Sequence, residues 1–228
     1  MKEFILYHGS KNIIEKPIYH GGKKENDYGY GFYCTESLEL AKEWACSNNS
    51  SNGFANKYSL IIDDLKILDL TNKNYSILNW IAILLKNRTF DLTNEISIQA
   101  KDYIIQNFYI DICDYDIVIG YRADDSYFSF AKDFINNTIS VRQLSKAMSL
   151  GNLGKQVVLI SEKAFNNIKF EGFESVNHLE YYPKRQARDE KARKDYLEGQ
   201  LRTKSYLNDI FVIDIMRRGL KNGDSSLQ

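Results

Sequence analysis

Apolar and polar positions alternate along this chain in short runs, and the pattern predicts a mixture of strands and helices. Apolar runs of about four to eight residues, bounded by polar turns, are typical of β-strands. Such runs predict strands at residues 2–7, 56–62, 66–70, 116–120, 156–160 and 168–174. Apolar residues at helical spacing predict helices after Thr35, at about 75–87 and 94–109, at 126–134 and after Ser140.

Residues that favour helix ends refine these ranges. Thr35 is expected to cap the first helix, which carries Trp44 on its apolar stripe. Ser140, with Gln143 three residues later, predicts a capping box. Gly151 is placed to end the helix that follows this box.

The character of the sequence changes at residue 181. From there to about residue 204, basic side chains recur without an apolar stripe, which predicts an exposed helix; a more apolar stretch follows it. We therefore expect a main domain at residues 1–180 and a C-terminal basic helical extension at 181–228. For the main domain we predict the α+β class, with two small antiparallel sheets packed around a cleft and helices on the outside.

Composition narrows the kinds of partner. Thirty basic residues balance thirty acidic ones, so the net charge does not steer the protein toward nucleic acid or membranes. The cysteines Cys34, Cys46 and Cys113 lie far apart and show no metal-ligand spacing, which fits a reducing compartment and predicts no metal site. No apolar run approaches the roughly 20 residues that span a bilayer. We expect a cytoplasmic protein with no membrane partner.

The first stretch that could carry chemistry is Tyr7 to Ser10, "YHGS". A histidine at a strand end, followed by a glycine and a hydroxyl, offers an imidazole and unobstructed backbone groups to a ligand. The alternative is an ordinary strand end with a turn glycine.

The second stretch is Gly29 to Thr35, "GYGFYCT". A nucleotide-binding GxGxxG loop is excluded because the third glycine is missing. A hairpin turn would explain Gly29 and Gly31 but not Phe32 and Tyr33. Another hypothesis is that the glycines fold the backbone around a planar ligand while Tyr33 presents its ring. These aromatic residues could equally belong to the core.

Together, in this order and spacing, the two stretches resemble motifs of the ADP-ribosyltransferases of the diphtheria-toxin and poly(ADP-ribose) polymerase type. In that superfamily a "HG[ST]" strand end precedes a "GxG[IF]Y" segment and a helix with a further aromatic residue. The segments "LYHGS", "DYGYGFYCTESLELAKEWA", "YDIVIGYRADDSYF" and "SEKAF..IKFEGFE" also look like a bacterial family assigned to it. The resemblance covers about residues 3–175 and implies split antiparallel sheets around an NAD cleft, with peripheral helices.

The resemblance also implies roles for individual residues. His8 would bind a ribose hydroxyl of NAD, the Gly9 backbone would bind the nicotinamide carboxamide, and Ser10 would support them. Tyr33 would stack on the nicotinamide ring and Trp44 would cover its other side. The implied NAD-binding set is completed by neighbours of Tyr33, namely Phe32 and Thr35.

The third motif departs from the superfamily pattern. Many relatives carry a glutamate at the start of a later strand, where this chain has Gln156, which can hold a hydroxyl but brings no negative charge. This substitution indicates single ADP-ribose transfer and not chain elongation. Asp124 and Asp125 are the candidates for the missing charge or for a base, and Asp125 could instead cap the next helix. Arg122 could pair with an NAD phosphate or with these acids.

The resemblance predicts a mono-ADP-ribosyltransferase that cleaves NAD and modifies a macromolecular acceptor, either nucleic acid or protein. By analogy it would be a bacterial toxin of a toxin–antitoxin or phage-defence system, with an antitoxin protein as partner. The alternative is a non-catalytic module that binds NAD or ADP-ribose, suggested by Gln156. Transfer of an RNA 2′-phosphate is disfavoured, because only His20 and His178 remain as the additional histidines which that class uses.

Overall fold

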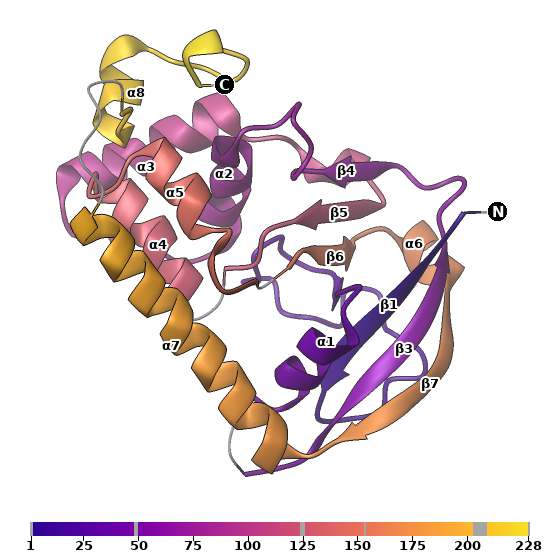
Figure 1. Cartoon of the computed structure of the whole chain (residues 1–228). Helices are drawn as coiled ribbons and strands as arrows, with labels where there is room; N and C mark the ends of the chain where they lie inside the picture. Colours follow the sequence, from indigo (N-terminus) through magenta and orange to yellow (C-terminus); the bar gives the residue numbers. More distant parts are fainter. Residues whose placement is uncertain (1, 48–49, 124–125, 153, 203–208, 228) are drawn as a thin grey trace.

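The protein folds into two small β-sheets with helices around them, so the predicted α+β class is confirmed (Figure 1). The computed structural model describes residues 2–47, 50–123, 126–152, 154–202 and 209–227. The first sheet has the order β1 (Glu3–Ser10), β3 (Gly53–Ile61) and β7 (Ile168–Val176). The second has the order β2 (Phe32–Cys34), β6 (Gln156–Leu159), β5 (Ile117–Gly120) and β4 (Ile67–Asp69).

The described residues form eight α-helices, most of which pack beside the second sheet (Figure 1). Their bounds are α1 Leu38–Ala45, α2 Ile77–Asn87, α3 Glu95–Phe108, α4 Ser126–Ile135, α5 Val141–Ala147, α6 Glu162–Asn167, α7 His178–Arg202 and α8 Val212–Arg218. Helix α2 is apolar on every side and is buried from Ile77 to Leu85, so it forms the centre of the larger core. None of the helices in the described ranges combines the length and the apolar character that crossing a bilayer requires.

The second sheet is mixed, which corrects the expectation of two antiparallel sheets. Strands β2, β6 and β5 pair in antiparallel fashion, but β4 runs parallel to β5. Parallel neighbours need a long crossover, and here α2 and α3 supply it between β4 and β5. The sequence pattern located β4, β5, β6, α2 and α3 but not the short β2, and it carries no direct signal for strand direction.

The two sheets meet at one isolated bridge, between Tyr7 of β1 and Thr35 just after β2. The Tyr7 amide donates to the Thr35 carbonyl at 2.7 Å, and the Thr35 amide donates to the Tyr7 carbonyl at 2.9 Å. A second core, which includes Leu6 and Tyr58 of the first sheet and Val157 of the second, lies between the sheets. Beyond the bridge the C-terminal end of β1 continues without a neighbour from the second sheet.

Several predicted helix ends are placed differently in the structure. The side chain of Ser37, not Thr35, caps α1 by accepting the amide of Leu40. Thr35 Oγ1 instead accepts the amide of Ser37. The capping box at Ser140 is confirmed, but α5 ends at Ala147, well before Gly151.

The long basic helix α7 lies along α1 and α4 and makes a buried contact with α1 (Figure 1). Arg188 of α7 donates from Nε and Nη2 to both carboxylate oxygens of Glu43 on α1, at 2.8 and 2.7 Å, and from Nη1 to the Gly151 carbonyl. Glu43 is buried, with 4% of its surface exposed. The helical character predicted for this region is therefore confirmed, but part of its basic face is used in packing. Whether 181–228 forms a separate domain stays a prediction.

Replacing Arg188 with alanine should lower the free energy of unfolding by about 2 kcal/mol, because it leaves the Glu43 carboxylate buried without its counter-charge. The loss stays below that of a fully buried pair, since the Arg188 side chain is 25% exposed. Chemical denaturation measures the change. The control is Lys191→Ala on the same helix, which removes an exposed pair with Asp195 and should cost less than about 0.5 kcal/mol. Equal losses in both variants would contradict the assignment.

Candidate functional site

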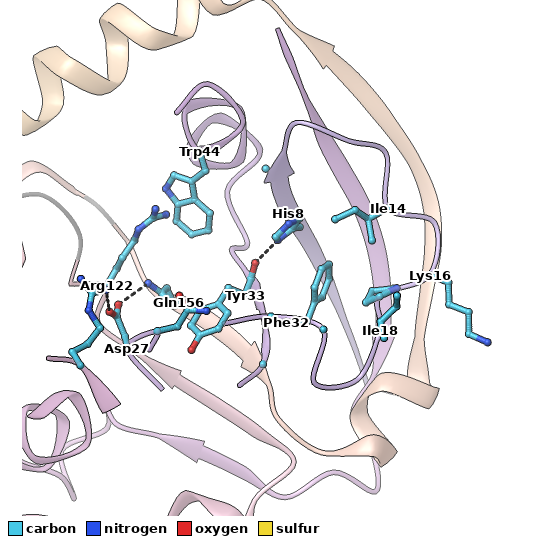
Figure 2. Close-up of a pocket in the computed structure, with 17 residues that line it drawn as sticks. His8, Ile14, Lys16, Ile18, Asp27, Phe32, Tyr33, Trp44, Arg122 and Gln156 are labelled. Atoms are coloured by element: carbon cyan, nitrogen blue, oxygen red, sulfur yellow. Dashed lines mark hydrogen bonds and ion pairs between the residues drawn. The ribbon is translucent and has the colours of Figure 1, made fainter. Parts of the chain in front are cut away.

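A cavity of about 600 Å³ lies where the end of β1, β2, α1 and the start of β6 meet. Its volume falls within the range typical of small-molecule sites. Seven of the residues predicted to act on a ligand line it together: His8, Gly9, Phe32, Tyr33, Trp44, Arg122 and Gln156. They come from five separate segments of the chain, so the fold brings them to one place, and all but Gly9 are labelled in Figure 2.

His8 is held in one protonation state by its neighbours. Its Nδ1 lies 2.7 Å from the carbonyl oxygen of Tyr33, and because a carbonyl only accepts, Nδ1 carries the proton. Burial lowers the pKa of His8; the bond to the Tyr33 carbonyl opposes this shift, and the positive charge of Arg122 adds to it. His8 is therefore neutral at pH 7, and its Nε2 is a hydrogen-bond acceptor.

Gly9 combines close packing with a free strand edge. A Cβ at this position would lie 1.9 Å from the Ala41 carbonyl oxygen, so only glycine lets α1 approach β1 here. Backbone groups of successive strand residues point to opposite edges, so those of every second residue share an edge, and those of Tyr7 point to the bridge with Thr35. The N–H and C=O of Gly9 therefore leave β1 on the same side as those of Tyr7, past the end of the bridge and toward the cavity.

Tyr33 presents its ring and not its hydroxyl. The hydroxyl donates to the Gly29 carbonyl at 2.7 Å and accepts the Tyr28 amide at 3.1 Å. Gly29 has a φ of 74°, so this turn requires the left-handed conformation that glycine adopts without strain. Burial is the main cause that raises the pKa of Tyr33, which stays neutral. Phe32 packs against the imidazole of His8, with ring centroids 4.5 Å apart.

Gln156 lines the cavity and has one buried polar atom without a partner. Its Nε2 donates to Asp27 Oδ2 at 3.3 Å, whereas Oε1 is buried and has no hydrogen-bond partner among the described residues. Exchanging the two amide atoms would place an oxygen against the carboxylate, so the bond to Asp27 fixes the orientation. An unpaired buried acceptor is costly, and a ligand hydroxyl or amide that donates to Oε1 would remove this cost.

Trp44 lies across the cavity from Gln156 and beside a cation (Figure 2). The guanidinium of Arg122 lies 3.7 Å from the centroid of its ring. The indole Nε1 is buried and likewise has no hydrogen-bond partner within the described part of the chain. Trp44 thus offers the cavity an aromatic surface.

Asp27 is the lining residue of greatest chemical interest that the sequence did not reveal. Its carboxylate is buried, with 6% of the residue exposed; Oδ1 pairs with Arg88 Nη1 at 3.0 Å, and Oδ2 accepts the Ala123 amide at 2.8 Å as well as Gln156. Asp27 lies in a loop whose composition indicates only a turn, and its one distinguishing signal is its position just before "GYGFY". A negative charge is therefore present at the site, directly behind Gln156.

Two further features of the site were not predicted from the sequence. Lys16 and Arg88 line the cavity with cationic side chains, together with Arg122, for which an NAD phosphate was one of the predicted partners. Asn56 is fully buried on β3 and anchors the loop after β1, because it accepts the Ile14 amide and donates to the carbonyls of His8 and Asn12. A buried asparagine in a strand run was the signal that could have identified this anchor.

The remaining predicted site residues do not line the cavity. Ser10 Oγ donates to the Asn12 carbonyl and accepts Asn56 Nδ2 at 3.1 Å, so it helps to hold the loop. Thr35 is buried at the bridge between the sheets. Asp124 and Asp125 lie outside the described residues, and their proposed roles stay predictions.

Fold and site together define an α+β protein with a ligand-sized cavity between two small sheets. The model of a family described as protein of unknown function (DUF3990) matches residues 4–170, and because this is most of the chain, the protein belongs to that family. No curated protein and no solved structure matched the chain.

The neutral state of His8 predicts a specific pH dependence of stability. The folded-state pKa lies below the ordinary value of 6.5, so below pH 6.5 the unfolded chain binds a proton that the folded protein rejects. The free energy of unfolding should therefore fall as the pH drops from 6.5 toward the folded-state pKa. The difference between wild type and His8→Asn should shrink over this range. Denaturation from pH 5 to 8 and an NMR titration of the imidazole measure it; a pKa above 6.5 would contradict the assignment.

Proposed function

We propose that this protein is a mono-ADP-ribosyltransferase that cleaves NAD between nicotinamide and ribose and transfers ADP-ribose to a macromolecular acceptor. The observation that carries the proposal is the convergence of His8–Gly9, Tyr33, Trp44 and Gln156 on one cavity that contains an unpaired buried acceptor. The arrangement of two sheets joined by a single bridge supports the finer proposal of an ADP-ribosyltransferase-like fold.

The nicotinamide end of NAD fits the groups around Gly9. A carboxamide has one carbonyl and one NH₂ group, and the outward N–H and C=O of Gly9 complement both. The ring of Tyr33, whose hydroxyl is already engaged, offers an apolar face for the pyridine ring, and Trp44 supplies a second aromatic surface.

The ribose would be held by two acceptors from opposite sheets. Neutral His8 offers Nε2 and Gln156 offers Oε1, and each can accept a hydrogen bond from a ribose hydroxyl. The cationic groups of Lys16, Arg88 and Arg122 also line the cavity and complement the diphosphate of NAD.

Bond cleavage places positive charge on the ribose, which the site can stabilise. The electron pair of the C–N bond passes to the nicotinamide nitrogen, and nicotinamide leaves as a neutral molecule. The acceptor then forms the new bond at the anomeric carbon and releases its proton. In this proposal Asp27 supplies through Gln156 the negative field that relatives obtain from a glutamate. Asp27 is thus a positioning residue, because it fixes the direction of the Gln156 amide.

The biological part of the proposal is a bacterial toxin of a toxin–antitoxin or phage-defence system, acting in the cytoplasm and restrained by an antitoxin protein. It follows from the resemblance of the sequence motifs alone.

Expression without the antitoxin should arrest growth, and His8→Ala should relieve the arrest at equal protein level.

Three variants each remove a group that is proposed to hold NAD: His8→Ala, Tyr33→Ala and Gln156→Ala. Each should release nicotinamide from NAD about two orders of magnitude more slowly than wild type. Release is measured by chromatography, with a lysate as acceptor source. Tyr33→Phe is the matched control, because it keeps the ring and loses only the hydrogen bonds of the hydroxyl; it should retain most of the activity. Circular dichroism checks that every variant folds. Activity in Tyr33→Ala equal to that of wild type would overturn the stacking role.

The second candidate function is a module that binds NAD without turnover, favoured by the presence of an amide where relatives have an acid. Calorimetry would then show tight NAD binding by wild type and weak binding by Gln156→Ala, while no nicotinamide forms over hours. Nicotinamide release that depends on His8 and Tyr33 excludes this alternative.

Introducing the missing acid as Gln156→Glu should make NAD binding depend on pH in an unusual way. The new carboxyl group would lie beside Asp27, so the pKa of one of the two would rise and the pair would share a proton at low pH. In its protonated form the introduced carboxyl group can donate to Asp27 as the Gln156 amide does, so NAD binding should persist near pH 5.5 and weaken by about tenfold near pH 8. Calorimetry across this range tests the prediction. A pH-independent affinity would show that Asp27 and the side chain at position 156 are not in contact.

A further inference from the structure

The loop that follows β1 forms one rim of the cavity and is held in a defined shape. Several of its residues line the cavity, among them Ile14, Lys16, Ile18, Gly21 and Gly22. Its start is fixed by Asn56, and by Tyr58, whose hydroxyl donates to the Ile14 carbonyl at 2.5 Å. We define the rim as residues 11–26 together with Tyr30.

The outer side of the rim carries a column of three stacked rings. Tyr19 and His20 stack with centroids 4.0 Å apart at 29°, and His20 and Tyr30 at 5.0 Å and 28°. Tyr19 also meets the edge of Phe165 at 5.5 Å, which supports one end of the column on α6. His20 has a φ of 57°, a conformation that is uncommon for residues with a Cβ and that places its ring in the stack.

These rings remain open to solvent beside the cavity. Tyr19 is 40% exposed and Tyr30 41% exposed, and Ile18, which also lines the cavity, is 76% exposed. Large rings with this much exposure next to a ligand-sized cavity are typical of a binding surface. A column of nearly parallel rings can be extended by another flat ring.

The charges of the rim indicate what kind of flat ring it would accept. Four lysines of the rim are exposed, and the exposed acids are fewer: the lysines are Lys11, Lys16, Lys23 and Lys24, and the acids are Glu15 and Glu25. The overall charge of the chain is balanced, so this excess of positive charge is local to the rim. Exposed aromatic rings combined with lysines match the bases and phosphates of single-stranded nucleic acid.

We propose that the rim binds single-stranded nucleic acid, with bases stacked on Tyr19 and Tyr30 and phosphates near the lysines. The surface continues into the cavity through Ile18 and Lys16, so a bound strand would lie next to the site where ADP-ribose is released. The strand is then the acceptor of the transferase reaction. This last step rests on the proposed function, whereas the binding of the strand does not.

The test is fluorescence anisotropy with labelled single-stranded DNA and RNA of about twelve nucleotides, without NAD and at about 50 mM salt. Wild type should bind the single strands more tightly than a duplex of the same sequence, and affinity should fall as salt rises. The double variant Tyr19→Ser/Tyr30→Ser should bind at least about tenfold more weakly. Lys23→Gln/Lys24→Gln should reduce the salt dependence.

The matched control is Phe173→Ser on β7, which removes an aromatic ring that is 47% exposed elsewhere on the surface. It should bind as wild type does, and melting curves check that each variant folds. Absence of oligonucleotide binding, equal affinity for duplex, or unchanged binding by the tyrosine variant would overturn the proposal. Labelled ADP-ribose that appears only on protein after incubation with a lysate would overturn the role of the strand as acceptor.

The proposed transferase activity and the proposed binding of nucleic acid by the rim can be overturned independently of each other. Nicotinamide release that depends on His8, without oligonucleotide binding, removes the rim proposal and leaves the transferase. Oligonucleotide binding that depends on Tyr19 and Tyr30, without NAD cleavage, leaves the rim proposal and removes the transferase.

Discussion

Two backbone hydrogen bonds between Tyr7 and Thr35 are the constraint on which the site depends. They hold β1 of the first sheet against the segment after β2 of the second, and the pairing stops there. A sheet that continued would use the next backbone groups of β1 in its own ladder. Because it stops, the groups of Gly9 remain available, and Gly9 also admits α1, which carries Trp44. One short contact thus creates both the opening between the sheets and its aromatic wall.

Around that opening, polar groups are fixed in direction by partners outside the cavity. The Tyr33 carbonyl holds the proton of His8 on Nδ1, and Asp27 holds the amide of Gln156, so each leaves an acceptor for a ligand. Such preorganisation means that a ligand does not have to reorient these groups when it binds. A buried polar network of this kind is destabilising when one of its atoms lacks a hydrogen-bond partner. The unpaired Oε1 of Gln156 therefore indicates where a donor group of a ligand would be favourable.

The sequence predicted the parts of this site that depend on local pattern. His8, Tyr33 and Trp44 were identified because glycine, aromatic and helix signals lie within short segments, and the main helices and every strand except the short β2 follow from apolar periodicity. Asp27 was missed because its role arises from Gln156, far away along the chain. The parallel pairing of β4 and the capping of α1 by Ser37 were also mispredicted, because direction and cap choice depend on tertiary contacts.

The ion pair between Glu43 and Arg188 has a consequence for the boundary of the functional unit. Glu43 precedes Trp44 in α1, so the helix that presents the indole is anchored by a residue near the middle of α7. The segment shared with the family ends at residue 170, inside β7 and before α7 begins. In this protein the tryptophan wall is therefore supported by a part of the chain that lies beyond the segment matched by the family.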